Sequence, residues 1–350
     1  MLSIKSYPGA LNYSISLPPI IVASTQSEVT VKLLDGATEV IQETYNPFNL
    51  TTPLVIKFGS LIDDLLTIEK PSADLVTIHD QGFRTYTFQV IDADQTFERT
   101  FKVIKGFWVR QPVDIEFKTA NFWLNIASLP QSVKTHQPVY LTALPASDIT
   151  VKVDCVYDDG SKATYTHGSL VASKLQTIDV AAYLMQQKST KKLIQYTVYG
   201  LKGTALQLAK QVFIVEHYNH LIHDFFVWRN RLGGFDSLVM SGEEKSTFKN
   251  ETSVALMDEY NIEYGGTRTR TVKKNSGYIQ SRQHRMMLID FAFSKQRYHF
   301  LDGAMRAINV KDPAVDITKN SVNEVDFEFT YSDTLLAYPY LDQAPNYLQL

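Results

Sequence analysis

The sequence predicts a mainly β protein: two consecutive β-sandwich modules, which a duplication would explain, and a C-terminal β-sandwich domain with one α-helix. Three observations lead to this prediction. Short segments that alternate apolar and polar residues recur along the chain and are separated by Asp-Gly turn signals. Tyr and Phe, which suit half-buried strands, are frequent at 19 each. The order of hairpin, helix and strand-pair signals in the first third recurs in the second third, whereas the last third differs.

Composition sets the outer limits of this prediction. A length of 350 residues suggests two or three domains. We place them at residues 1–107, 108–217 and 218–350. The net charge of −3 argues against bulk binding of nucleic acid, which needs a basic surface. Cys155 is the only cysteine, so an internal disulfide cannot form.

The N-terminal stretch MLSIKSYPGALNYSIS lacks the charged region and apolar core of a secretory signal. No apolar run approaches the length of a membrane span. We therefore expect a protein that is made and kept in the cytoplasm, or released by lysis, and that has no membrane partner.

The first module is predicted to contain a hairpin, a strand that runs into a short helix, and a second strand pair. In chain order these elements are Val29–Leu34 with Glu39–Thr44, Leu54–Phe58 with Leu61–Ile68, and Thr85–Ile91 with Phe97–Ile104. Asp35-Gly36 supplies the turn of the first hairpin.

The second module repeats this order. Its elements are Ile149–Val153 before the turn at Asp159-Gly160, Leu175–Val180 with the short helix Ala181–Gln187, and Ile194–Tyr199 with Gln211–Val215. Because corresponding elements lie at similar separations, an internal duplication is favoured. A chance match of two all-β modules that share only their turn spacing is the alternative.

The segment Gly106–Tyr140 joins the modules and is rich in aromatic residues and prolines. Exposed tryptophans such as Trp108 and Trp123 could stack on sugars, which would make the protein a glycan-binding β-sandwich protein. Interdomain packing and the first strand of the second module explain the same residues more simply, and we favour that interpretation.

The stretch Asp224–Gly242 is predicted to form a β-hairpin. A strand buried on both faces precedes Gly233-Gly234, and a second strand follows. Asn230, Gly233, Gly234 and Asp236 form the structural motif of its turn, with Asp236 within reach of Arg229 or Arg231. A phosphate-binding loop is disfavoured, because the glycines do not open a helix and no Lys-Ser/Thr pair follows them.

The C-terminal domain is predicted to contain one helix, one hairpin and one half-buried strand. Ser281 is a good N-cap for the helix Arg282–Phe293, whose apolar residues cover most of its faces. The hairpin Arg297–Val310 turns at Asp302-Gly303, and Val325–Tyr331 alternates cleanly. Two short strands, Asn261–Tyr264 and Thr267–Thr271, are expected before the helix.

No residue pattern predicts catalysis, a cofactor or a metal. His217, His220 and His223 have the spacing HxxHxxH, but they do not converge on a strand or on a helix. Adjacent carboxylates such as Asp63-Asp64 point to opposite sides of a strand. One basic cluster stands out. Its residues are Arg268, Arg270, Lys273, Lys274, Arg282 and Arg285. We interpret it as a solvated face. A surface for an acidic protein partner is the second interpretation and a nucleic-acid surface the third.

The aromatic strand Phe225–Trp228, the motif around Asn230–Asp236 and the strand that ends at Gly242 resemble those of tail or virion structural proteins. Those proteins belong to phages and prophages of bacteroidete bacteria. The elements after the motif are also similar in order to those of tail-tube and distal-tail proteins. The resemblance implies a non-enzymatic virion component that assembles as a ring in the tail or distal tail and has no catalytic residues. The ring number stays open, with a hexamer as one option. Other tail proteins would be further partners, and assembly would take place in the host cytoplasm.

We predict that the ring interface lies on the helix and on the last strand. The helix is too apolar for one small sandwich to cover all of its apolar residues. Its first turn carries Arg282 and Arg285, whose positive charges interact unfavourably with the positive end of the helix dipole. Met287 and Phe291 are the predicted apolar contacts, and Glu324, Asp326 and Glu328 are the predicted acidic surface of the neighbouring copy.

Overall fold

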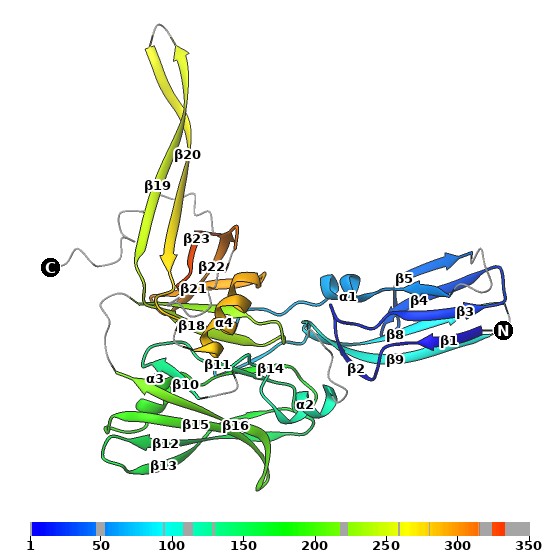
Figure 1. Cartoon of the computed structure of the whole chain (residues 1–350), viewed down its shortest axis with the longest axis horizontal. Coiled ribbons are helices and arrows are strands. Elements are labelled where there is room, and N and C mark those ends of the chain that lie inside the picture. The colour runs from blue at the N-terminus through cyan, green and yellow to red at the C-terminus, as the bar shows by residue number, and fades with distance from the viewer. Residues whose placement is uncertain are drawn as a thin grey trace. The chain divides into compact units, whose positions relative to one another are not determined.

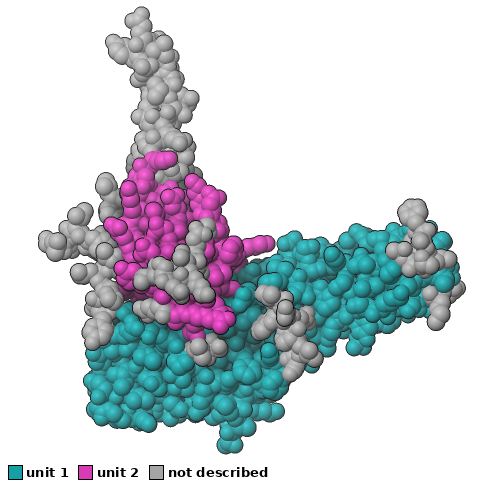
Figure 2. All heavy atoms as spheres, in the orientation of Figure 1, with its two compact units in different colours: residues 1–219, 228–237 teal, residues 220–227, 238–350 magenta. Residues whose placement is uncertain are grey.

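The computed structural model describes residues 2–46, 53–93, 95–107, 115–127, 130–217, 223–257, 260–279, 281–313, 315 and 324–332, and only the backbone over 250–269. The chain divides into two compact units (Figure 2). Unit 1 comprises Met1–Asn219 and Trp228–Ser237, and unit 2 comprises His220–Val227 and Leu238–Leu350. The predicted fold class is confirmed: the protein is mainly β, with several sheets and few helices.

The first module of unit 1 contains one helix and two sheets (Figure 1). Its elements are β1 (Leu2–Ser6), β2 (Leu11–Tyr13), β3 (Ile20–Ser24), β4 (Val29–Asp35), β5 (Thr38–Tyr45), β6 (Leu54–Ile56), α1 (Gly59–Leu65), β8 (Phe83–Ile91) and β9 (Thr96–Ile104). One sheet has the order β2-β9-β8-β4-β5 and the other β1-β3-β6.

The second module of unit 1 begins after a short helix that the sequence did not predict, α2 (Ile115–Asn121). Its elements are β10 (Gln131–Lys134), β11 (Tyr140–Ala143), β12 (Ile149–Tyr157), β13 (Lys162–Leu170), β14 (Gln176–Asp179), α3 (Ala182–Gln186), β15 (Leu193–Lys202) and β16 (Ala205–Glu216). Its large sheet has the order β10-β16-β15-β12-β13.

The two modules share one strand order. In each large sheet the first strand pairs parallel with the last, β2 with β9 and β10 with β16, and the remaining pairs are antiparallel. The opposite sheets contain the equivalent antiparallel pairs β3–β6 and β11–β14. This is the arrangement of an immunoglobulin-like sandwich. The common topology that a duplication of the two modules predicts is therefore present.

Each module has its own hydrophobic core. Val31, Phe88 and Val103 belong to the core of the first module, and Val153 and Phe213 to that of the second. These residues alternate along strands with exposed ones, which explains why the pattern was readable in the sequence. Gly36 and Gly160 have φ angles of 61° and 79° at the predicted hairpin turns.

One strand of the first module crosses into the second. β7 (Val76–Ile78) follows α1 in the chain, yet it pairs antiparallel with β14 and completes the sheet β11-β14-β7. Directly after it, Nε2 of the buried His79 lies 2.8 Å from the hydroxyl of Thr177. Burial lowers the pKa of His79 to about 4, although Asp80 opposes the shift.

This histidine predicts a pH-dependent term in the stability of unit 1. Between pH 6.5 and about pH 4, His79 is protonated in the unfolded chain but stays neutral in the folded chain. The free energy of unfolding therefore decreases as the pH falls through this range. The shift in the pKa of His79 corresponds to a total loss of about 3 kcal/mol in the free energy of unfolding. Asp179 opposes it, because burial raises the pKa of that carboxyl to about 6 and favours folding as the pH falls.

The two terms are separated by comparing the wild type with His79→Gln. The difference in their free energies of unfolding, measured by urea denaturation, is expected to shrink by about 3 kcal/mol between pH 6.5 and pH 4. A difference that does not change with pH contradicts the assignment.

Unit 2 is built on a seven-stranded sheet with the order β18-β17-β21-β22-β23-β20-β19 and one helix. Its elements are β17 (Asp224–Arg229), β18 (Phe235–Met240), β19 (Glu244–Met257), β20 (Tyr260–Asn275), α4 (Arg282–Phe293), β21 (Arg297–Leu301), β22 (Ala304–Lys311) and β23 (Asp326–Tyr331). The tip of the β17–β18 hairpin, Trp228–Ser237, belongs to unit 1.

The predicted helix, hairpin and last strand of unit 2 are confirmed. α4 has the predicted bounds, and the hydroxyl of Ser281 accepts a hydrogen bond from the backbone N–H of His284. The β21–β22 turn has φ angles of 50° at Asp302 and 77° at Gly303. The prediction of two short strands before the helix was wrong: one continuous strand, β20, covers both, and β19 had no counterpart in the prediction.

Candidate assembly site

The most distinctive element of unit 2 is the hairpin of β19 and β20, which we call the arm (Figure 1). Its strands are 14 and 16 residues long and pair antiparallel from Glu244↔Lys274 to Met257↔Tyr260. Only its base joins the sheet, where Val272–Asn275 pair with β23. Among the described strands, no other strand pairs with the rest of the arm. The arm therefore presents two long edges of backbone hydrogen-bonding groups.

The helix α4 corrects part of the predicted interface. Met287 and Phe291 are buried within unit 2, where the Phe291 ring lies 5.3 Å from Phe327 and 5.6 Å from Phe226. They are core residues, because the sheet covers more of the helix than its apolar pattern suggested. The apolar residues that α4 exposes are Met286 and, at 68%, Phe293.

The charged part of the predicted interface is placed as follows. Arg282 is exposed and Arg285 is half-buried at the start of α4. Glu324, just before the last strand, and Asp326 on it are exposed, and Glu328 on the same strand is half-buried. Asp326 already has partners in its own chain: it accepts a hydrogen bond from Asn275 and forms an ion pair with Lys273 at 2.8 Å.

The basic cluster is not one solvated face. The Lys274 side chain is fully buried. Arg270 is half-buried: its guanidinium donates to the hydroxyl of Ser246 and lies over the ring of Phe248. The side chain of Arg268 lies outside the described residues. The sequence pattern failed here because it cannot tell which residue of a strand faces the core.

Lys274 belongs to a buried polar network that the sequence did not reveal. Its Nζ contacts Oδ2 of Asp224 on β17, and Oδ1 of Asp224 lies 3.4 Å from Nε2 of His299 on β21. Nδ1 of His299 is 2.8 Å from the hydroxyl of Tyr331 on β23. The rings of His299 and Phe226 stack with centroids 4.9 Å apart. Residues from four strands thus meet inside an aromatic core.

A second carboxylate stands beside this network. Glu244 on β19 is the direct cross-strand partner of Lys274, so the two side chains lie on the same face of the sheet. Burial raises the pKa of Glu244, and the negative charge of Asp224 adds to the shift. Burial acts in the same direction on Asp224, but the close contacts of its carboxylate with His299 and Lys274 outweigh burial and hold the pKa of Asp224 at about 2.

The loop Asn230–Asp236 is the structural motif that the sequence predicted, and it lies in unit 1. Asp236 is buried and accepts hydrogen bonds from the side-chain amides of Asn125 and Asn230 and from the backbone N–H of Ile126. The Asn230 side chain in turn accepts from the backbone N–H groups of Leu232 and Gly234. These contacts hold the turn against the second module.

The two glycines of the loop are required for different reasons. Gly233 has a φ of 84°, which L-residues rarely adopt, and a Cβ there would lie 2.6 Å from the carbonyl oxygen of Lys105. Gly234 has no positive φ, but a Cβ would collide with the carbonyl oxygen of Leu124 and lie 2.9 Å from Thr142. A left-handed backbone conformation and a close backbone approach therefore account for Gly233, and close packing alone accounts for Gly234.

Trp123 does not present an exposed ring on which a sugar could stack. Trp123 is only 8% exposed, and its indole N–H donates to the carbonyl oxygen of Ala209 at 2.8 Å. Trp108 lies outside the described residues. β10 and the packing of Trp123 match the simpler interpretation of this linker.

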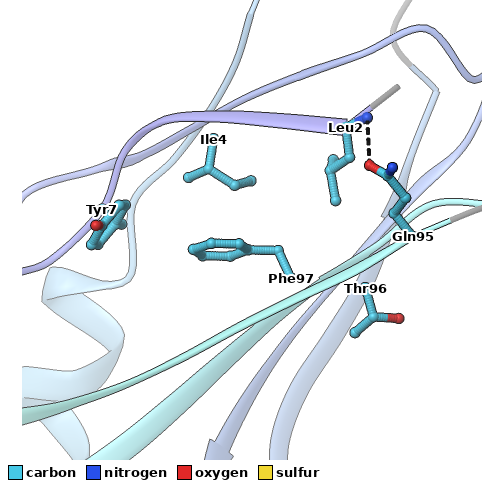
Figure 3. A pocket seen from close by; sticks show the side chains of 6 residues that line it. All are labelled: Leu2, Ile4, Tyr7, Gln95, Thr96 and Phe97. Atoms are coloured by element: carbon cyan, nitrogen blue, oxygen red, sulfur yellow. Dashed lines mark hydrogen bonds between the residues drawn. The ribbon is translucent and has the colours of Figure 1, made fainter.

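A surface hollow lies between β1 and the start of β9 (Figure 3). Its volume is about 390 Å³, and it is lined by Leu2, Ile4, Tyr7, Gln95, Thr96 and Phe97. The side-chain oxygen of Gln95 already accepts a hydrogen bond from the backbone N–H of Leu2. Its lining mixes polar and apolar side chains and includes no Asp, Glu, Lys, Arg or His, so the hollow offers no such charged side chain to fix a ligand.

The predicted histidine series is dispersed: a ring nitrogen of His217 lies 2.6 Å from the carbonyl oxygen of Leu193, His223 packs on Phe225, and His220 lies outside the described residues. Within the described ranges, no three His, Cys, Asp or Glu residues are grouped so that they could hold a metal ion. No helix of the described part has the length and hydropathy needed to cross a membrane.

No protein family and no curated protein matches the chain. Among solved structures, the chain is similar to a titin fragment described as Titin-A168169, with 7% identity and a TM-score of 0.25, over 62% of this chain and 99% of that chain. It is also similar to invasin, a bacterial integrin-binding protein, with 12% identity and a TM-score of 0.24, over 79% of this chain and 56% of that chain.

Proposed function

We propose that this chain is a non-enzymatic structural component of a tailed phage or a phage-derived particle. It assembles with copies of itself into a ring in the tail or distal tail, and it also contacts other tail proteins. It would reach the virion from the host cytoplasm. The observation that carries the proposal is the arm, because no strand of the described chain covers it beyond its base.

The arm supports assembly on physical grounds. A two-stranded ribbon is marginally stable alone in water, and its unpaired edges are templates for another strand. When a neighbouring copy adds a strand to one edge, the arm gains main-chain hydrogen bonds along its length. A head-to-tail contact of this kind closes into a ring when the rotation between copies allows it. Exposed Phe293 and Met286 supply apolar area that the same contact can cover.

Shortening the arm is expected to abolish ring assembly and to leave both units folded. The variant replaces residues 251–267 with an Asn-Gly turn, which keeps the register Asn250↔Arg268 and the pairing of the base with β23. A matched control alters the β15–β16 turn at Gly203, which lies in unit 1. Electron micrographs of particles assembled with either variant give the readout.

The decisive measurement is a particle structure in which this chain is located. We expect each arm to pair with the arm or sheet of an adjacent copy. If the arm contacts no other chain there, or if the shortened variant forms rings like the control, the proposed assembly is wrong.

A further inference from the structure

We propose that unit 2 closes an isopeptide bond between Nζ of Lys274 and Cγ of Asp224, without the help of another protein. This inference does not depend on the proposed function, since it concerns chemistry inside one chain. It rests on the position of the lysine, on its apolar surroundings, and on the second carboxyl group, that of Glu244, on the same face of the sheet.

The reacting groups are already in contact. Lys274 reaches the core from β20, and its side chain is fully buried against the carboxylate of Asp224. Among the described residues, its Nζ nevertheless has no hydrogen-bond partner of normal geometry. An ammonium group normally donates three hydrogen bonds, so a fully buried lysine with one contact is poorly satisfied as a cation. A neutral amine that attacks a neighbouring carboxyl carbon needs fewer hydrogen bonds than an ammonium group does.

The surroundings favour removal of the two charges. Phe327 is the cross-strand neighbour of Lys274 on β23, and its ring packs 5.5 Å from that of Phe226. An ion pair in such a core loses its hydration, and its attraction repays that loss only with further hydrogen bonds. Because the pKa of Asp224 is about 2, the reactive form is a minor one, in which one proton has moved from Lys274 to Asp224 to give a neutral amine and a neutral acid. The free amine is the nucleophilic form of lysine.

Glu244 and His299 supply the remaining chemistry. His299 can donate from Nε2 to Oδ1 of Asp224, because the Tyr331 hydroxyl can hold Nδ1 as the acceptor. This donor stabilises negative charge that develops on that oxygen when Nζ attacks Cγ. Glu244, directly opposite Lys274 in the ladder, accepts the proton that nitrogen loses and returns it to the departing hydroxyl. The guanidinium of Arg270 lies 3.9 Å from the Glu244 carboxylate, and its positive charge opposes the rise in the pKa of Glu244.

The reaction is balanced without an oxidant or co-reactant. The C–N bond between Lys274 and Asp224 forms, the bond between Cγ and one carboxyl oxygen of Asp224 breaks, and one water leaves. Glu244 ends in its starting protonation state. The product ties β17 to the base of the arm in a chain whose single cysteine excludes an internal disulfide. Such a link restricts the unfolded chain and holds the arm's base under load.

The test is the intact mass of the denatured wild-type chain. We expect it to be lighter by one water than the mass calculated from the sequence, and protease digestion should yield one branched peptide that contains both Asp224 and Lys274. A wild-type chain of full calculated mass, or a loss of water located elsewhere, overturns the proposal.

Two variants separate the reaction from folding. Glu244→Gln keeps both reacting residues, so it should fold, as judged by circular dichroism, and retain its full mass. Glu328→Gln, a half-buried carboxylate on β23, is the matched control and should lose one water like the wild type. If Glu244→Gln loses water as completely and as fast as the wild type, the proton-carrying role of Glu244 is wrong although the bond stands.

Discussion

Phe291→Ala is expected to destabilise unit 2 by about 3–5 kcal/mol, the range for large-to-small changes at buried aromatic positions. The ring of Phe291 packs against Phe226 and Phe327 and is 2% exposed, so its loss leaves a cavity in the middle of the unit. Hydrogen exchange of peptides from β22 and β23 measures the effect, because opening of unit 2 exposes their backbone amides.

Phe293→Ala is the matched control, since Phe293 lies on the same helix and is 68% exposed. It should change stability by no more than about 0.5 kcal/mol. Equal effects of the two substitutions contradict the placement of α4. The same difference in burial decides which substitution can test assembly. Phe291→Asp would unfold unit 2, whereas Phe293→Asp changes only the exposed face of α4.

Asp236→Ala is expected to destabilise unit 1 by about 3–5 kcal/mol, because several buried donors lose their acceptor and each unsatisfied donor costs about 1–3 kcal/mol. The substitution leaves the side-chain amides of Asn125 and Asn230 and the N–H of Ile126 without their acceptor. Buried donors that lose their partners destabilise the fold by more than the bond itself contributed.

Urea denaturation with circular dichroism measures this loss. Asp64→Ala, at an exposed carboxylate on α1, is the control and should stay within about 0.5 kcal/mol of the wild type. If Asp236→Ala is as stable as that control, the network around the loop is not what holds it.

The sequence by itself determined the local elements whose signals are short in range. Asp-Gly pairs specify tight turns because Gly accepts positive φ, and this holds at Gly36, Gly160 and Gly303. Ser281 and the apolar spacing after it specify the bounds of α4. Alternation over Val325–Tyr331 predicted one buried face, and Val325, Phe327 and Phe329 are buried. The repeated order of such signals was enough to predict that two modules share one topology.

Tertiary structure alone decided which residues meet. β7 pairs with a strand about 100 positions further along the chain, a choice that no local pattern encodes. The apolar residues of α4 look alike in sequence, yet Phe291 is buried and Phe293 exposed, because only the sheet opposite determines which face is covered. The basic residues of β20 also look alike in sequence. One of them, Lys274, became a core residue because Asp224 and His299 lie on the strands that surround it.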